Sequence, residues 1–430
     1  MSGSGAAGAG PRAASPQLRR VLSRTDLVVY GLTIITPTAA YPVFGRLQQV
    51  SNGHAALSYL IAVVAMLLTA LSYGRMAAAF PSAGSTYTYA TRSLHEYTGF
   101  LAGWSMILDY VLVPLLSAVY VALTASRIAP AIPYEAWAFV FAAGVTLVNL
   151  YGMRVTARAS RVMMLIMTAS TVLFVALAAV TVFRDGGATA LLQPTAVLNR
   201  DTFALPPLIA AAAVATLSYL GFDAVSTLAE DTRDPDRDIG FATVLVCLLQ
   251  TVFCFLVSYF ATLVWPAARP FANVETAILD VSSVLGGSAM VGFTSFVLLI
   301  GAVASSVTSQ AGASRLLYGM GRDGVLPRSI FGYLDPKSAT PTRSICLMGA
   351  ISFVGALLIS FQTVVELVNF GAFVGFILVN VSVVRHYYLR LKQRTGTALW
   401  RNLLFPLAGA MVCAYVWMNL GTNAKLLGFA

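Results

Sequence analysis

The sequence contains very little charge for its length. Only 10% of its 430 residues are Asp, Glu, Lys or Arg, whereas 58% are hydrophobic. A typical soluble domain has about a quarter charged residues, because polar groups must cover its surface. This shortage excludes an ordinary soluble protein and indicates a chain that lies mostly in lipid.

Cysteine and histidine are also scarce. The four cysteines lie within apolar runs without forming a CxxC motif, and the three histidines are scattered without metal-ligand spacing. We therefore expect neither a disulfide framework nor a metal site, and no cofactor. The chain also lacks HExxH, GxSxG and P-loop motifs, so we do not expect an enzyme.

Residues 1–24 lack an apolar run of any length. They are rich in Gly, Ala and Ser and end in a basic stretch with Arg19, Arg20 and Arg24. We expect a disordered basic cytoplasmic tail rather than a cleaved signal peptide.

Long apolar runs fill the rest of the chain. A helix needs roughly 20 apolar residues to cross the hydrocarbon core. Eleven candidate spans meet this description, at residues 27–50, 55–80, 99–128, 134–151, 162–183, 205–229, 241–265, 289–320, 344–360, 364–385 and 403–420.

The basic residues between these spans are unevenly distributed. With a cytoplasmic N-terminus, 21 of the 27 Lys and Arg residues fall on the cytoplasmic side. This positive-inside bias predicts a multi-pass protein of the plasma (inner) membrane in that orientation. It also argues against nucleic-acid binding, because the basic residues lie in short loops and the expected surroundings are a lipid bilayer.

Two spans carry helix-breaking residues at mid-membrane depth. The first contains Thr36, Pro37 and Thr38, and the sixth contains Gly221 beside Asp223. Backbone groups freed within a bilayer must be satisfied by protein, water or ligand. Breaks five spans apart predict two five-helix repeats, at 25–185 and 200–395, with residues 396–430 forming an eleventh helix and a short outer tail.

Four segments resemble the amino acid–polyamine–organocation permease superfamily. They are FPSAGSTYTY at 80–89, GFLAGWSMILDY at 99–110, GFD at 221–223 followed by AEDTRDP at 229–235, and SRLLYGMGRDGVLP at 314–327. The resemblance implies an all-α five-plus-five inverted-repeat (LeuT-type) transporter fold. Within the superfamily, the sequence is most similar to the putrescine importers, because Thr36-Pro37 in the first helix and Asp109 in the third helix match their pattern.

The chain departs from the superfamily pattern in three ways. Thr36-Pro37-Thr38 replaces the Gly-containing break that holds a substrate carboxylate in many amino-acid members. Met167 occupies the position at which some members have a lysine in the fifth helix. Members usually have twelve helices, and we expect the counterpart of the twelfth to be absent here.

Intramembrane polar residues are candidate sites because burying them in lipid is costly. Asp223 could bind a substrate ammonium group or carry a coupling proton, or it could cap the broken helix. Asp109 could be an anionic pole for a cationic substrate or part of a structural hydrogen bond. The predicted substrate-binding residues are Thr36, Pro37, Thr38, Asp109, Tyr110, Tyr219, Phe222 and Asp223.

The coupling ion and the gate have weaker signals. Ser305 and Ser306 could hold Na⁺, but such hydroxyls often bond to their own helix, so we favour a proton. The charge run after the sixth span predicts a cytoplasmic gate or a solvated loop. Its candidate gate residues are Glu230, Arg233, Arg315 and Arg322.

Together these patterns predict a secondary active transporter that imports a small amine-bearing solute, a polyamine or an amino acid, by H⁺ symport or antiport. A neutral amino-acid permease is one alternative. A membrane solute sensor that binds without transport is another.

Overall fold

The computed structural model describes residues 20–128, 131–151, 153–359 and 361–419. Most of the predicted disordered tail therefore lies outside the described residues, as do residues 420–430. Helices account for most of the described chain, and it contains no strand beyond one isolated bridge between Leu22 and Thr232. The helices are α1 (Arg24–Ile35), α2 (Ala40–Val50), α3 (Ala55–Ala79), α4 (Ser85–Ser93), α5 (Glu96–Ile128), α6 (Tyr134–Leu150), α7 (Met153–Ala190), η1 (Pro194–Ala196), α8 (Leu205–Ala215), η2 (Thr216–Tyr219), η3 (Phe222–Asp231), α9 (Pro235–Val264), η4 (Val274–Thr276), α10 (Ala277–Arg322), α11 (Thr342–Leu358), α12 (Phe361–Val383), η5 (Val384–Arg390), α13 (Thr397–Leu399), η6 (Trp400–Leu404) and α14 (Phe405–Met418).

The first predicted span is a broken helix. α1 and α2 meet at an angle of 56° across the residues between Ile35 and Ala40. Thr36 has a φ of 66°, which ends the helical geometry of α1. Pro37 follows it and disfavours a helical conformation in the residue before it. The predicted break in the first span is therefore confirmed.

The sixth span is broken at its glycine. α8 and η2 end before Leu220, and Gly221 adopts a left-handed φ of 103°. Beyond it the chain continues as η3, which is wound as a 3₁₀ helix. Only glycine adopts this φ without a steric penalty from a Cβ atom, so Gly221 allows the turn.

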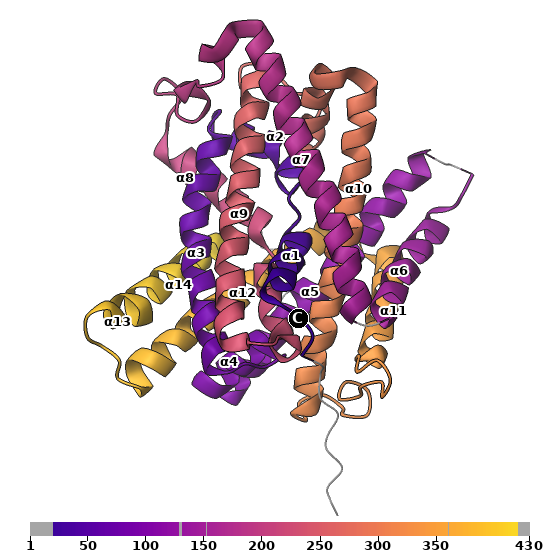
Figure 1. Cartoon of the computed structure of the whole chain (residues 1–430), viewed down its shortest axis with the longest axis vertical. Coiled ribbons are helices and arrows are strands. Elements are labelled where there is room, and N and C mark those ends of the chain that lie inside the picture. The colour runs from indigo at the N-terminus through magenta and orange to yellow at the C-terminus, as the bar shows by residue number, and fades with distance from the viewer. Residues whose placement is uncertain (1–19, 129–130, 152, 360, 420–430) are drawn as a thin grey trace, which may run out of the picture.

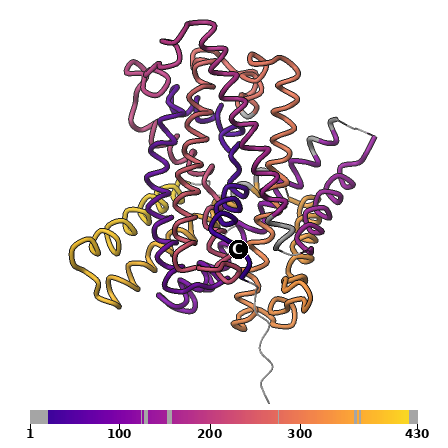
Figure 2. Tube along the Cα trace, viewed as in Figure 1, coloured from indigo at the N-terminus to yellow at the C-terminus, as the bar shows by residue number. Residues whose placement is uncertain are grey.

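Two groups of helices pack around the breaks. α3 lies along α9. At the breaks, α9 contacts both α1 and η3, and α3 contacts η3. α5 is central to the other group and contacts α6, α10, α11 and α12. α14 packs on α12 and α3 and lies at one side of the molecule, whereas α6 and α11 lie together at the other (Figure 1, Figure 2).

The predicted spans correspond to helices in the structure, with two changes of detail. α10 joins the predicted eighth span to a preceding segment across a kink at Gly286 and Gly287, and α7 kinks at Gly187. Within the described residues, eight helical segments are long and apolar enough to cross a membrane, including the broken sixth span Leu205–Asp231, and the bent α1–α2 pair makes a ninth candidate. α6 and α11 are shorter apolar helices. The count of eleven and the repeat boundaries stay predictions.

We call one end of the helix bundle the basic end, because the arginines that the sequence places on the cytoplasmic side gather there. There α1 and α9 begin and α10 finishes, at the lower end of Figure 1. The guanidinium of Arg24 bonds to Asp238 across this end, with an Nη2–Oδ1 distance of 2.6 Å. It is the end that the charge distribution predicts to be cytoplasmic.

Candidate functional site

The two broken helices are joined by one side chain from α9. Nε2 of buried Gln250 donates to the carbonyl oxygen of Thr36 at 3.0 Å and to that of Ser218 at 3.1 Å. Ser218 also shares a hydrogen bond of 3.0 Å with Tyr59. The breaks free carbonyl groups in a region without bulk water, and Gln250 satisfies one from each helix.

The predicted substrate residues of the first break lie against α10. A methyl group placed on Gly301 would lie 3.5 Å from Thr38 Oγ1 and 3.8 Å from Thr36 Cγ2. It would also lie 3.7 Å from the sulfur of Met167. The break region, α7 and α10 therefore converge here, and Met167 is a buried apolar neighbour of the break.

Two carboxylates come together at the centre of the fold. Asp223 follows the break in the sixth span, and Asp109 lies midway along α5 beside Tyr110. Both residues are almost wholly buried. The Tyr110 hydroxyl donates a hydrogen bond to Asp223 Oδ2. The structure thus unites three sequence-predicted residues in one polar cluster.

This cluster has unused hydrogen-bonding capacity. Asp223 Oδ1 and Asp109 Oδ2 are both buried, and neither has a hydrogen-bond partner among the described residues. The backbone of α12 packs directly against the backbone of α5 beside Asp109. A methyl group on Gly371 of α12 would lie 2.2 Å from the Ser105 carbonyl oxygen and 3.2 Å from the Asp109 nitrogen. An unpaired buried carboxylate is costly, so these oxygens can take a proton or a cation.

The two predicted aromatic residues of the sixth span are fully buried. Phe222 packs against Phe376 with ring centroids 5.1 Å apart and against Tyr73 at 5.7 Å. Tyr219 shares a hydrogen bond of 2.9 Å with Thr251. Both rings thus have packing partners, and their predicted role in closing over a substrate stays a prediction.

The hydroxyls considered for sodium point in different directions. Ser305 donates to the Ile34 carbonyl oxygen, at the end of α1, at 2.8 Å. Ser306 instead bonds back to Ala302 in its own helix at 2.7 Å. Of this pair only Ser305 faces the first break, as the sodium hypothesis requires, and a cation role stays untested.

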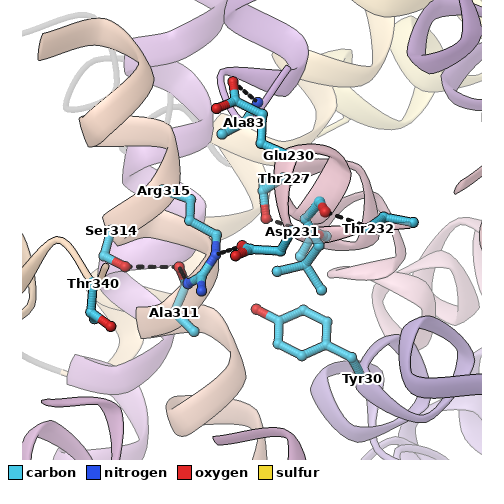
Figure 3. A network of polar contacts seen from close by, with 12 residues as sticks. Tyr30, Ala83, Thr227, Glu230, Asp231, Thr232, Ala311, Ser314, Arg315 and Thr340 are labelled. Atoms are coloured by element: carbon cyan, nitrogen blue, oxygen red, sulfur yellow. Dashed lines mark hydrogen bonds and ion pairs between the residues drawn. The ribbon is translucent and has the colours of Figure 1, made fainter. Parts of the chain in front are cut away.

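The predicted gate residues meet near the basic end. Arg315 on α10 forms a 2.5 Å ion pair with Asp231 at the end of η3, and both side chains are 4% exposed. Figure 3 shows this pair with Tyr30 beside it. Arg322 lies about two helical turns further along α10. Its Nη1 atom contacts both carboxylate oxygens of Glu230, at 2.8 and 2.9 Å.

Glu230 also ties the gate to a third segment. Its Oε1 atom accepts a hydrogen bond of 3.0 Å from the Ala83 nitrogen, in the linker between α3 and α4 (Figure 3). Arg233, the remaining predicted gate residue, is exposed, and its backbone nitrogen donates to the Leu22 carbonyl oxygen at 3.1 Å. The basic end is therefore closed by contacts between η3, α10 and the α3–α4 linker.

Sequence reasoning missed two residues of this framework as site residues. Asp231 lies within the recognised charge run, but only the fold shows that it pairs with Arg315 while Glu230 pairs with Arg322. Gln250 is a polar residue in an otherwise apolar span, which was a usable signal. Its partners are backbone atoms of two other spans, and the sequence pattern does not reveal them.

Within the described residues, no group of three His, Cys, Asp or Glu side chains could hold a metal ion. The geometry instead defines a polar cluster between broken helices, inside a bundle of apolar helices. This arrangement is that of a multi-pass membrane protein with polar groups buried at the breaks in its helices.

The family model for amino acid permeases matches residues 39–423, so the chain belongs to the amino acid permease family. It is 33% identical to the low-affinity putrescine importer PlaP of Escherichia coli over 423 residues, covering 97% of this chain and 92% of PlaP. It is 28% identical to the branched-chain amino acid permease BcaP of Bacillus subtilis, covering 94% and 89% of the two chains. The methylthioribose transporter of Bacillus subtilis is 26% identical, with 96% and 94% covered.

These similarities confirm the superfamily resemblance and the all-α LeuT-type fold. The protein is a membrane transporter for a small molecule and not an enzyme. The named relatives carry chemically different solutes, so family membership leaves the substrate open.

Proposed function

We propose that this transporter imports an amine-bearing solute, a polyamine or an amino acid whose ammonium group binds at Asp109, and couples uptake to protons. The observation that carries the proposal is the buried pair of Asp109 and Asp223, with one unpartnered oxygen on each. Two buried carboxylates in one cluster cannot both remain charged in an apolar site without a cation or a proton.

Each carboxylate has a distinct part in this proposal. Asp109 receives the substrate ammonium group. Asp223 carries the coupling proton, and Tyr110 orients its carboxylate. The similarity to a putrescine importer supports an ammonium-bearing substrate.

Transport proceeds by alternating access, with the basic end on the cytoplasmic side of the inner membrane. The central aspartates are buried, and ion pairs link η3 to α10 at the basic end. Release to the cytoplasm requires η3 to separate from α10, which breaks the Asp231–Arg315 and Glu230–Arg322 contacts. The first and sixth spans then rock against the α5 group.

The test is uptake of labelled putrescine into proteoliposomes under an imposed inward proton gradient, with unlabelled polyamines and amino acids as competitors. Asp109→Asn and Asp223→Asn are compared with wild type and with Asp201→Asn, which changes an exposed aspartate outside the site. We expect polyamines to block uptake, both site variants to lose it, and Asp201→Asn to retain it.

Three results would count against the proposal. Uptake of alanine or leucine that survives Asp109→Asn, without putrescine uptake, would indicate a neutral amino-acid permease with a structural Asp109. Saturable binding without flux of any tested solute would indicate a sensor. Uptake driven by a sodium gradient alone would overturn proton coupling and direct attention to Ser305.

A further inference from the structure

The basic end has two regions that differ in charge balance. In the first, four arginines pair with carboxylates across helices. These pairs are Arg24–Asp238, Arg161–Asp26, Arg315–Asp231 and Arg322–Glu230. The second region lies where α3 and α4 meet the connection from α12 to α14, and there four arginines have no carboxylate partner among the described residues.

We name the second region the basic seam and define it by Arg75, Arg92, Arg390 and Arg401. None of the four forms an ion pair with a carboxylate in the described part of the chain. No Asp or Glu follows Glu366, so the segment that carries Arg390 and Arg401 has no carboxylate of its own. The excess of positive charge is therefore built into this part of the molecule.

Aromatic contacts hold the seam together. The Arg75 guanidinium lies 3.9 Å from the centre of the Tyr387 ring, and the Tyr387 hydroxyl donates back to the Arg75 carbonyl oxygen at 3.0 Å. His386 packs on Phe80 with ring centroids 4.9 Å apart. These contacts fix η5 against the end of α3.

The cations of the seam lie near one another despite their repulsion. Nη1 of Arg390 lies 3.5 Å from the Arg92 carbonyl oxygen. η6, which carries Arg401, packs on η5, whose Tyr387 ring lies under the Arg75 guanidinium. Nε of Arg75 is buried and has no hydrogen-bond partner among the described residues. An anionic group with several acceptor oxygens, such as a phosphodiester, would offset the repulsion and supply the missing acceptor.

The surroundings of the seam indicate what that anion is. Leu389 and Leu391 are 42% and 48% exposed beside Arg390, and Trp400 is 56% exposed beside Arg401. Apolar and tryptophan side chains exposed next to arginines are typical of the headgroup level of a bilayer. α14 then enters the apolar region directly after η6. A soluble anion would not account for these apolar neighbours.

We propose that the basic seam binds the phosphate of an anionic phospholipid, with the acyl chains along the apolar residues of η5 and η6. Basic pockets between helices at the cytoplasmic surface suit such headgroups. The bound lipid would link α3, which packs with the broken helices, to the connection between α12 and α14. This inference is independent of the proposed substrate.

The test titrates the detergent-solubilised full chain with phosphatidylglycerol and, separately, with phosphatidylcholine, and measures bound lipid by native mass spectrometry. The seam variant is Arg390→Gln/Arg401→Gln, which changes two exposed side chains. The matched control is Arg233→Gln/Arg237→Gln, which removes the same charge from exposed arginines in the acidic run.

We expect the seam variant to bind phosphatidylglycerol on the order of tenfold more weakly than wild type, while the control stays within twofold. Phosphatidylcholine binding should be the same in all three proteins. If the double variant does not fold, Arg401→Gln alone should still weaken binding severalfold.

Equal losses in the seam and control variants would reduce the effect to net charge and overturn the site. Displacement of phosphatidylglycerol by millimolar glycerol phosphate would show a site for soluble phosphate and overturn the lipid assignment. Unchanged phosphatidylglycerol binding in the seam variant would also refute the proposal.

Discussion

The Tyr110 hydroxyl donates a hydrogen bond to Asp223, which joins the middle of α5 to the start of η3. The contact connects the helix group around α5 to the broken sixth span, at the depth where the chain has its unpartnered carboxylate oxygens. A change at this contact therefore affects both the charge cluster and the position of the break.

Replacing Tyr110 by Phe removes this donor and leaves the ring in place. A hydrogen bond to a charged group is worth about 1.5–3 kcal/mol, so we expect kcat/KM for uptake to fall at least tenfold. The measurement is initial uptake rate against substrate concentration in proteoliposomes. Tyr415→Phe, on exposed α14, is the control and should behave as wild type. Normal uptake by Tyr110→Phe would show that the hydroxyl has no part in transport.

Gln250→Met should destabilise the junction of the two broken helices. The substitution keeps the side-chain volume but removes the donor shared by the carbonyl groups of Thr36 and Ser218. Leaving these buried acceptors without it should cost about 2 kcal/mol in the free energy of unfolding. Unfolding in detergent measures this, with exposed Gln193→Met as the control. Equal stability of the two variants would contradict a bracing role for Gln250.

The two ion pairs of the gate should differ in their effect on stability. Asp231→Asn leaves Arg315 as a buried charge without its ion-pair partner, which should cost about 3–5 kcal/mol in the free energy of unfolding. Adding Arg315→Gln should recover part of that loss. Glu230→Gln breaks a pair in which Arg322 is 41% exposed, so about 1 kcal/mol or less is expected.

A double-mutant cycle on each pair measures the coupling free energy directly. A larger coupling for Glu230–Arg322 than for Asp231–Arg315 would contradict the assignment of the buried pair as the stronger lock of the basic end.

Gly221→Ala should be strongly destabilising. A Cβ atom is strained at a φ of 103°, and this one would lie 3.0 Å from Ile34 Cγ1 on α1. The backbone strain alone should cost about 1–2 kcal/mol of stability. Gly144→Ala is the matched control, since it lies within α6 and its added methyl group meets nothing within 4 Å. Thermal unfolding of both variants in detergent checks the prediction. A Gly221→Ala protein as stable as Gly144→Ala would show that the break tolerates other conformations.

Much of the architecture could be predicted because it depends on short-range patterns. Apolar runs of membrane length located the helices, and Pro37 and Gly221 located the breaks, since both residues restrict or permit backbone angles locally. Asp109 and Asp223 stood out as candidates because carboxylates are rare at that depth.

Pairings between distant segments could not be predicted in the same way. In the sequence, Glu230 and Asp231 are neighbours, and Arg315 and Arg322 lie seven residues apart on one helix. The sequence does not show which arginine pairs with which carboxylate. In the structure, the turn of η3 directs Asp231 toward the interior and Glu230 toward the α3–α4 linker. Gln250 had no local signal for its partners, because both are carbonyl groups on other spans.

By itself, the sequence determined that this protein lies in a membrane, that its first and sixth spans break, and which few residues carry charge at depth. These properties can be read from single residues, because placing any polar group in the hydrocarbon core costs free energy wherever it occurs in the chain. Only the tertiary structure decided that the two aspartates share one cluster, that Gln250 spans both breaks and that the cations of the basic seam lack carboxylate partners. Those relationships depend on the packing of helices that are far apart in the chain.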